Sequence, residues 1–232
     1  MSFLKRLASR LPAHWQQELK RLQYRRRIHR RTFESTEPGS RILAQLITPG
    51  DWVIDVGANV GEYTKRLSDL VGASGRVVAV EPVPDTFALL AANVALFEHR
   101  NVTLLNLAAS DRSTLAGMEV PVFETGLKDY YDATITGEAS DPQVMTLALD
   151  SLRIEHRVSV IKIDAEGHDP VVLRGADALL ARDHPALIVE TLSPAAVERL
   201  ANLGYESEKL PGSGDTLCRW RADGTRAGHA EE

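Results

Sequence analysis

Two kinds of apolar pattern alternate along the chain. Short runs of consecutive apolar residues, typical of buried parallel strands, are followed by segments in which apolar residues recur every three or four positions, typical of amphipathic helices. The predicted strands are residues 52–56, 76–80, 102–107, 158–163 and 186–190, and the main predicted helices are 63–70, 85–97, 170–180 and 193–203. This alternation predicts an α/β fold with a mostly parallel central sheet.

Two regions depart from the alternation. Residues 205–210 and 216–220 have strand composition and predict an antiparallel pair at the edge of the sheet. Residues 112–146 lose the helical rhythm and contain two strand-like runs, 118–123 and 144–147, which we interpret as an excursion that places a loop over a ligand cleft. The expected organisation is a basic helical extension over 1–40, one domain over 41–221 and a flexible tail over 222–232.

The turn after the first predicted strand carries the first chemical signal. Asp55 interrupts the apolar run, and Gly57, Asn59 and Gly61 follow before the helix begins. Glycine and asparagine tolerate left-handed backbone, so they let a chain turn closely around a ligand. Glu81 ends the second predicted strand, where an acid is placed to bind the hydroxyls of a ribose. The sequence therefore predicts a nucleotide-like ligand at this turn.

The spacing of these residues distinguishes between ligands. A dinucleotide site requires Gly-x-Gly-x-x-Gly, whereas here Gly57 and Gly61 are four positions apart. Asp55 would repel a pyrophosphate but would favour the cationic ammonium and sulfonium of S-adenosylmethionine (SAM). The pattern favours SAM, while a nicotinamide dinucleotide and an α/β domain without a small cofactor remain alternatives.

A second motif follows the predicted strand 158–163. Asp164 comes at its carboxyl end, where ligands bind in open α/β sheets, and Glu166 and His168 follow at once. Asp169 is expected to cap a helix that begins at Pro170, as Asp85 is expected to cap the helix of residues 85–97. After strand 102–107, the small residues of 108–111 form a corner where an adenine ring could lie. Its members Ala109 and Ser110, with Pro82 after Glu81, complete the expected cofactor contacts.

Charge divides the chain unevenly. The net charge is −5, yet residues 1–32 carry ten Lys and Arg against one acid, leaving −14 on the remainder. The apolar residues of 1–32 recur at helical spacing, so this arm is expected either to pack its stripe on the domain or to contact an anionic membrane peripherally. No nucleic-acid motif accompanies the arginines, and no nucleic-acid partner is expected. The single cysteine, Cys218, indicates a reducing, cytoplasmic setting and is expected in the core.

Residues 50–192 resemble the FkbM-type SAM-dependent methyltransferases. The resemblance rests on the blocks 55–61, Glu81-Pro82, 161–167 and 173–176, of which Lys-x-Asp-x-Glu-Gly at 162–167 is the most specific. It implies a Rossmann-like class I methyltransferase fold and O-methylation of a hydroxyl on a sugar, glycan or natural-product-like acceptor. Where the family usually has Glu two residues after Gly167, this chain has Asp169. The alternatives are a nicotinamide-dependent reductase and a non-catalytic SAM-binding, membrane-associated module.

The acceptor side of the cleft is expected around the second motif. Asp164, Glu166 and His168 are the candidate catalytic residues, and Asp164 is also a candidate cofactor contact. His168 has the side chain whose ordinary pKa best suits a general base at neutral pH. Asp164, Glu166 and Glu190 could together bind Mg²⁺ or Ca²⁺, but carboxylates alone carry little signature, and we predict no metal.

Overall fold

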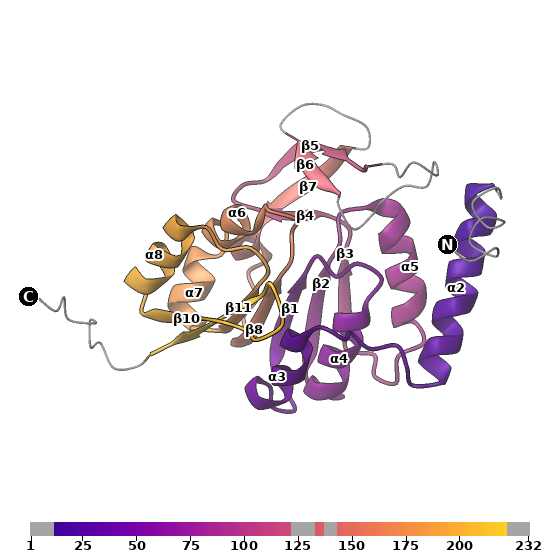
Figure 1. Ribbon diagram of the computed structural model, residues 1–232, viewed down its shortest axis with the longest axis horizontal. Helices are drawn as coiled ribbons and strands as arrows, with labels where there is room; N and C mark the ends of the chain where they lie inside the picture. Colours follow the sequence, from indigo (N-terminus) through magenta and orange to yellow (C-terminus); the bar gives the residue numbers. More distant parts are fainter. Residues whose placement is uncertain (1–11, 122–132, 137–142, 222–232) are drawn as a thin grey trace, which may run out of the picture.

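The computed structural model describes residues 12–121, 133–136 and 143–221, and two β-sheets form its framework (Figure 1). The larger sheet has the order β10-β11-β9-β8-β1-β2-β3. Its strands are β1 (Trp52–Val56), β2 (Arg76–Val80), β3 (Val102–Leu105), β8 (Val158–Ile163), β9 (Ala186–Val189), β10 (Tyr205–Lys209) and β11 (Thr216–Trp220). The first five are parallel, and β11 and β10 add an antiparallel edge. The predicted mostly parallel sheet and its late antiparallel edge are confirmed.

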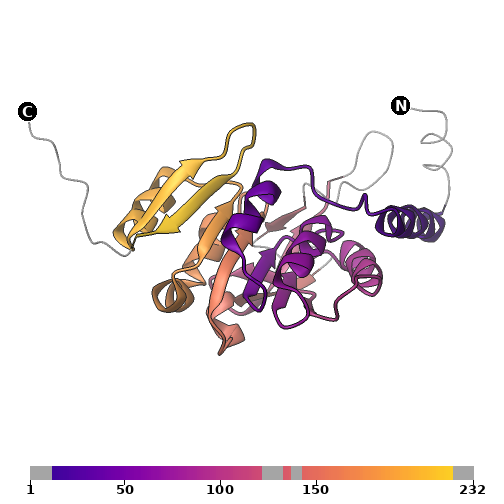
Figure 2. The ribbon, with the colours of Figure 1, turned by 90° about the horizontal axis from the view of Figure 1, so that it is seen from below.

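Helices cover both faces of this sheet (Figure 2). On one face, α3 (Pro38–Leu46), α4 (Glu62–Val71) and α5 (Pro84–Val94) pack against the strands, and α2 (Ala13–His29) lies outside α5. On the other face lie α6 (Asp169–Arg174), α7 (Asp177–Asp183) and α8 (Pro194–Asn202). A short 3₁₀ helix, η1 (Leu149–Leu152), precedes β8. Among the described residues, no helix is long and apolar enough to span a bilayer.

The alternation of side chains along the strands assigns each residue to one of these faces. In β1, Val53 packs with α3 and α4, whereas Ile54 and Val56 pack with the helices of the opposite face. Val53 and Asp55 therefore share a face, as do Val160 and Lys162 in the neighbouring β8. The register pairs Asp55 directly with Lys162. Two charged side chains thus enter the same buried layer, where each needs the other.

The second sheet is built from the excursion predicted between the third and fourth core strands. Its order is β4-β7-β5-β6, with strands β4 (Ala108–Ser110), β5 (Thr114–Glu119), β6 (Thr134–Thr136) and β7 (Gln143–Ala148). The expected corner at 108–111 is therefore mostly a strand, and β3 ends at Leu105 rather than at residue 107. Residues 122–132 and 137–142, which include part of the expected loop, lie outside the described residues.

Two predicted helix starts are wrong. The N-cap of α5 is Val83 rather than Asp85, because Pro84 occupies the first turn and holds the residue before it in an extended conformation. The N-cap of α6 is His168, since the turn that follows Glu166 runs directly into the helix and Asp169 is already helical. The expected domain boundary at residue 40 falls inside α3, and the expected tail over 222–232 lies outside the described residues.

Candidate functional site

The glycine turn after β1 is anchored to the end of β2. Gly57, Asn59 and Gly61 have φ angles of 73°, 48° and 97°, as the composition of the turn predicted. The amides of Gly57 and Ala58 both donate to the carbonyl oxygen of Val80, at 3.0 Å, which fixes the turn to the end of β2. Gly61 serves a different purpose from the other two, because it begins α4 as its N-cap.

Glu81 lies beside this turn at the end of β2. Its two carboxylate oxygens accept hydrogen bonds from the amides of Asn59 at 2.9 Å and Val83 at 3.0 Å. Burial raises the pKa of the Glu81 carboxyl to about 7, against the effect of these two hydrogen bonds. The two backbone hydrogen bonds hold the Glu81 side chain in place. Because each carboxylate oxygen has a second acceptor position, Glu81 can still accept hydrogen bonds from a ligand.

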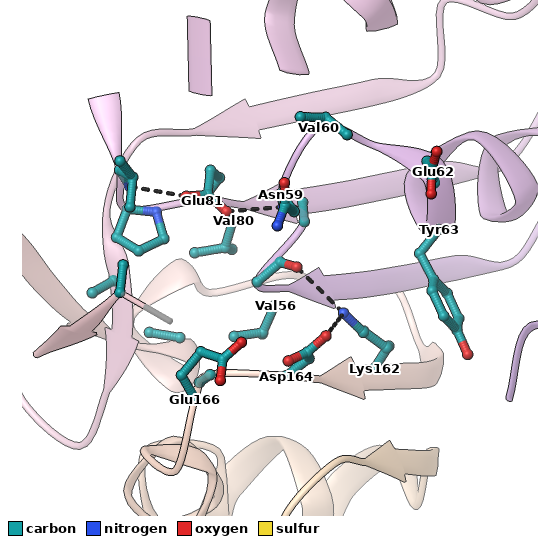
Figure 3. Close-up of a pocket in the computed structure, with 18 of the residues that line it drawn as sticks. Val56, Asn59, Val60, Glu62, Tyr63, Val80, Glu81, Lys162, Asp164 and Glu166 are labelled. Carbon is teal, nitrogen blue, oxygen red and sulfur yellow. Dashed lines mark hydrogen bonds and ion pairs between the residues drawn. The ribbon is translucent and has the colours of Figure 1, made fainter. Parts of the chain in front are cut away.

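A pocket opens between the glycine turn, the ends of β2 and β8 and the second sheet (Figure 3). The N-terminal strap, which we define as residues 30–37 between α2 and α3, contributes Ser35 and Glu37 to its wall. The charged side chains that line it are Glu37, Glu62, Glu81, Lys162, Asp164 and Glu166. Five acids and one amine give the lining a net negative charge, which suits a cationic ligand.

Lys162 is the cation at the centre of this lining. Its ammonium lies 2.8 Å from a carboxylate oxygen of Asp164, 4.0 Å from one of Asp55 and 3.3 Å from the carbonyl oxygen of Gly57. Although burial opposes the charge, the carboxylates of Asp164 and Asp55 raise the Lys162 pKa above its usual range. Lys162 thus carries a charge in a buried position and joins the two motifs of the chain.

Asp55 departs from its expected role in direct ligand contact. Its side chain is fully buried beneath α4, it accepts a hydrogen bond from the hydroxyl of Thr64 at 2.6 Å, and it is not part of the pocket wall. Burial raises the Asp55 pKa, while Lys162 and Thr64 oppose that effect. The reason is the strand alternation, which points Asp55 into the helix layer. From this buried position the Asp55 carboxylate stabilises the charge of the Lys162 ammonium.

Asp164 reaches the pocket as predicted and shares a hydrogen bond with Glu190, which follows β9. Burial disfavours its charge, yet the ammonium of Lys162 holds the Asp164 pKa below its usual range. Burial and the nearby Asp164 raise the pKa of Glu190 to about 8, so Glu190 is protonated at neutral pH and hydrogen-bonds to Asp164. Carboxylate oxygens of Asp164, Glu166 and Glu190 lie within 4.8 Å of one another. That spacing could accommodate a divalent cation, but Lys162 and the proton on Glu190 already offset two of the negative charges.

The structure divides the other predicted site residues into two groups. Those that line the pocket are Gly57, Asn59, Glu81, Pro82, Ala109, Asp164 and Glu166, and those outside its wall are Asp55, Gly61, Ser110 and His168. Ser110 and His168 contact each other instead, with the serine hydroxyl 3.1 Å from Nε2 of the imidazole. Burial lowers the His168 pKa. His168 is thus engaged beside the pocket rather than directed into it.

Several lining residues have no counterpart in the predicted site. Ser35 and Glu37 come from the N-terminal strap, and Met118, Ala133 and Ile135 come from the second sheet. Tyr63 in the first turn of α4 also lines the pocket, with the ammonium of Lys162 lying 5.1 Å from the centre of its ring. Only long-range packing brings the N-terminal strap and the second sheet to the glycine turn, whereas Tyr63 follows that turn directly in the sequence.

Comparison with known proteins agrees with this geometry. The sequence matches the Methyltransferase FkbM domain over residues 55–207. In fold, the chain is similar to the FkbM methyltransferase of Methylobacillus flagellatus KT, with a TM-score of 0.51 and 15% identity over 78% of this chain and 50% of that protein, so it spans about half the length of that relative. It is also similar to a protein of Clostridium thermocellum described as a candidate rRNA methylase, with a TM-score of 0.50 and 11% identity over 78% and 90% of the two chains. No curated protein matches the sequence significantly.

Proposed function

Because the chain belongs to the FkbM family of SAM-dependent methyltransferases, we propose that it methylates a hydroxyl group on a sugar, glycan or natural-product-like acceptor, using the pocket beside the glycine turn. The observation that carries the proposal is the Glu81 carboxylate. It is buried next to the turn, held by two backbone amides, and has acceptor positions left for the two hydroxyls of a ribose.

The residues present fit SAM, which carries a positive sulfonium and a positive ammonium. Gly57 and Asn59 would form the floor beneath the cofactor, and Pro82 and Ala109 would flank its adenine ring. At the other end of the pocket, Glu37 would attract the ammonium, and Lys162 would attract the methionine carboxylate. A dinucleotide fits less well, since its pyrophosphate would meet a lining with five carboxylates.

When bound, SAM supplies an electrophilic methyl group. The chain must then orient the acceptor oxygen, exclude water and receive one proton. Asp164 lies at the pocket end of β8 and is ionised by its pairing with Lys162, so it can accept a hydrogen bond from the acceptor hydroxyl. Glu190 already carries a proton and the Asp164 pKa is depressed, so Asp164 orients the hydroxyl, and the proton that the hydroxyl releases would pass to Glu166, the next carboxylate within reach of the same space, or to solvent.

The test is methyl transfer from isotopically labelled SAM to a panel of free sugars, glycans and hydroxylated natural products. The proposal predicts label in at least one acceptor, in a bond that is stable to mild base, as an ether is and an ester is not. Label recovered only in amine or carboxyl acceptors would overturn the O-methylation proposal. Calorimetric titration with SAM and with NADH distinguishes a methyltransferase from the alternative reductase. A methyltransferase would bind SAM, whereas a reductase would bind NADH and not SAM.

A further inference from the structure

We infer that the solvent-facing side of α2 binds an anionic lipid bilayer. This inference concerns a surface outside the pocket and does not depend on the acceptor proposed above. The surface consists of Trp15, Leu19 and Leu22, which we call the α2 stripe, together with the basic side chains beside it.

One side of α2 is fixed to the domain. Tyr24 and Ile28 pack into a cluster with Phe33, Leu89 and Phe97, and the Tyr24 and Phe33 rings meet edge to face at 5.7 Å. On the same side of the helix, the Gln17 amide donates to Asp85 on α5 at 3.0 Å, and Arg27 forms an ion pair with Glu62 on α4. These contacts dock the helix along α4 and α5 and determine which side faces solvent.

The opposite side of the helix is apolar and exposed. Trp15, Leu19 and Leu22 are spaced four and three residues apart, which places them on one face, about half a turn around the helix from Tyr24. They are 56%, 45% and 48% exposed. No other helix of the described residues exposes more than one large apolar side chain to this extent. An ordinary docked helix exposes polar residues on this side, so α2 carries a second apolar face, and the described residues leave Leu19 and Leu22 about half exposed there.

Charge identifies the partner of this face. Arg25, Arg26 and Arg30 are exposed and border or extend the α2 stripe. Glu18, the one acid within α2, already pairs with Arg21 at 2.7 Å. An apolar stripe with arginines beside it matches the interface of an anionic bilayer, where leucine and tryptophan enter the acyl boundary and guanidinium groups bind lipid phosphates. A nucleic acid would use the arginines but would gain nothing from exposed leucines, so the bilayer accounts for more of the surface.

The same segment connects this surface to the pocket. Ser35 in the pocket wall is six positions after His29 at the end of α2, and an extended chain of that length spans at most about 20 Å. A bilayer bound to α2 would therefore lie close to the N-terminal strap.

The experiment is flotation of the full-length protein with vesicles of phosphatidylcholine alone or mixed with phosphatidylglycerol. We expect binding to the anionic vesicles at least about tenfold stronger than to the zwitterionic ones, and a steep loss as salt rises. The double variant Leu19→Gln/Leu22→Gln should lose about tenfold or more of that binding, because it removes the apolar contribution at exposed positions. A matched control is Val197→Gln, which alters a 37% exposed apolar residue on α8, at the far end of the molecule (Figure 1), and should change nothing.

Two results would overturn the inference. One is equal binding to zwitterionic and anionic vesicles or to neither. The other is anionic binding that Leu19→Gln/Leu22→Gln leaves unchanged while an RNA duplex competes for it, which would make the surface a general polyanion site. An unchanged melting temperature in the double variant shows that it is folded, and the charge variant Arg25→Gln/Arg26→Gln, expected to weaken anionic binding and its salt dependence, tests the same surface independently.

Discussion

A Cβ atom added to Gly57 would lie 1.7 Å from the carbonyl oxygen of Asp164. The glycine turn and the end of β8 are therefore in direct backbone contact, and the amide of Asp164 also donates to the carbonyl oxygen of Val56 at 3.1 Å. The two most informative motifs of the sequence, more than a hundred residues apart, thus form one wall of the pocket.

Gly57→Ala should accordingly destabilise the protein more than backbone conformation alone explains. The left-handed backbone costs an alanine about 1 kcal/mol, and moving the carbonyl of Asp164 adds to that. Gly212→Ala is the matched control, since Gly212 has nearly the same φ, 75°, but nothing within 4 Å of an added Cβ. We expect Gly57→Ala to lower the melting temperature by several degrees more than Gly212→Ala. Equal shifts would show that the contact with Asp164 is unimportant.

Asp164→Asn should separate cofactor binding from catalysis. If the Asp164 carboxylate orients the acceptor hydroxyl, the variant should bind SAM within a few-fold of wild type and turn over at least about 100-fold more slowly. His168→Ala is the comparison, and we expect it to retain most of the activity because His168 contacts Ser110 outside the pocket wall. Loss of activity in wild-type protein treated with a chelator would instead assign the carboxylates of Asp164, Glu166 and Glu190 to a metal.

Glu190 should make stability fall as pH rises. Its pKa is about 8 in the folded protein and near the ordinary 4.5 when unfolded, so the folded state binds the proton more tightly. The stability that this proton supplies is complete below pH 4.5 and is lost as pH rises through 8. Glu190→Gln should reduce the fall in melting temperature between pH 5 and pH 9, whereas Glu208→Gln on the exposed strand β10 should not. Parallel curves for Glu190→Gln and wild type would refute this account of the Asp164–Glu190 pair.

Glu81 should make SAM affinity rise with pH. Its pKa is about 7, and only the ionised carboxylate can accept both ribose hydroxyls. Affinity should therefore increase from pH 6 to pH 8 and level off above that, with a slope of at most about tenfold per pH unit. Titrations across this range in a single ionic strength would measure it. In Glu81→Ala, SAM affinity should change little between pH 6 and pH 8. If the affinity of this variant still rises with pH, a group other than Glu81 causes the rise.

Much of this fold follows from the sequence because its signals are local. Consecutive apolar residues predict the parallel strands, and the glycines and Asn59 predict the turn whose φ angles the structure shows. The acids at strand ends are also predictable, since parallel strands bring their carboxyl ends to one edge. Glu81 and Asp164 both reach the pocket for this reason.

The remainder depends on relationships that a single sequence does not contain. Asp55 is buried because its position in β1 shares a face with Lys162, and that pairing requires the register between two strands. Ser35 and Glu37 join the pocket because the N-terminal strap that carries them runs between two helices docked on the domain, α2 and α3. His168 was placed in the cleft by its proximity to Asp164 in sequence, but the start of α6 turns it towards Ser110.

The most direct test of the central claim, that the pocket beside the glycine turn holds SAM, is calorimetric titration of SAM into wild type and Glu81→Ala at pH 8. Loss of two charge-assisted hydrogen bonds should cost about 2–3 kcal/mol, or roughly 30- to 150-fold in Kd, with no change in the circular dichroism spectrum. Glu208→Ala, at an exposed position, should bind like wild type. A folded Glu81→Ala protein that binds SAM as tightly as wild type does would contradict the assignment of this pocket.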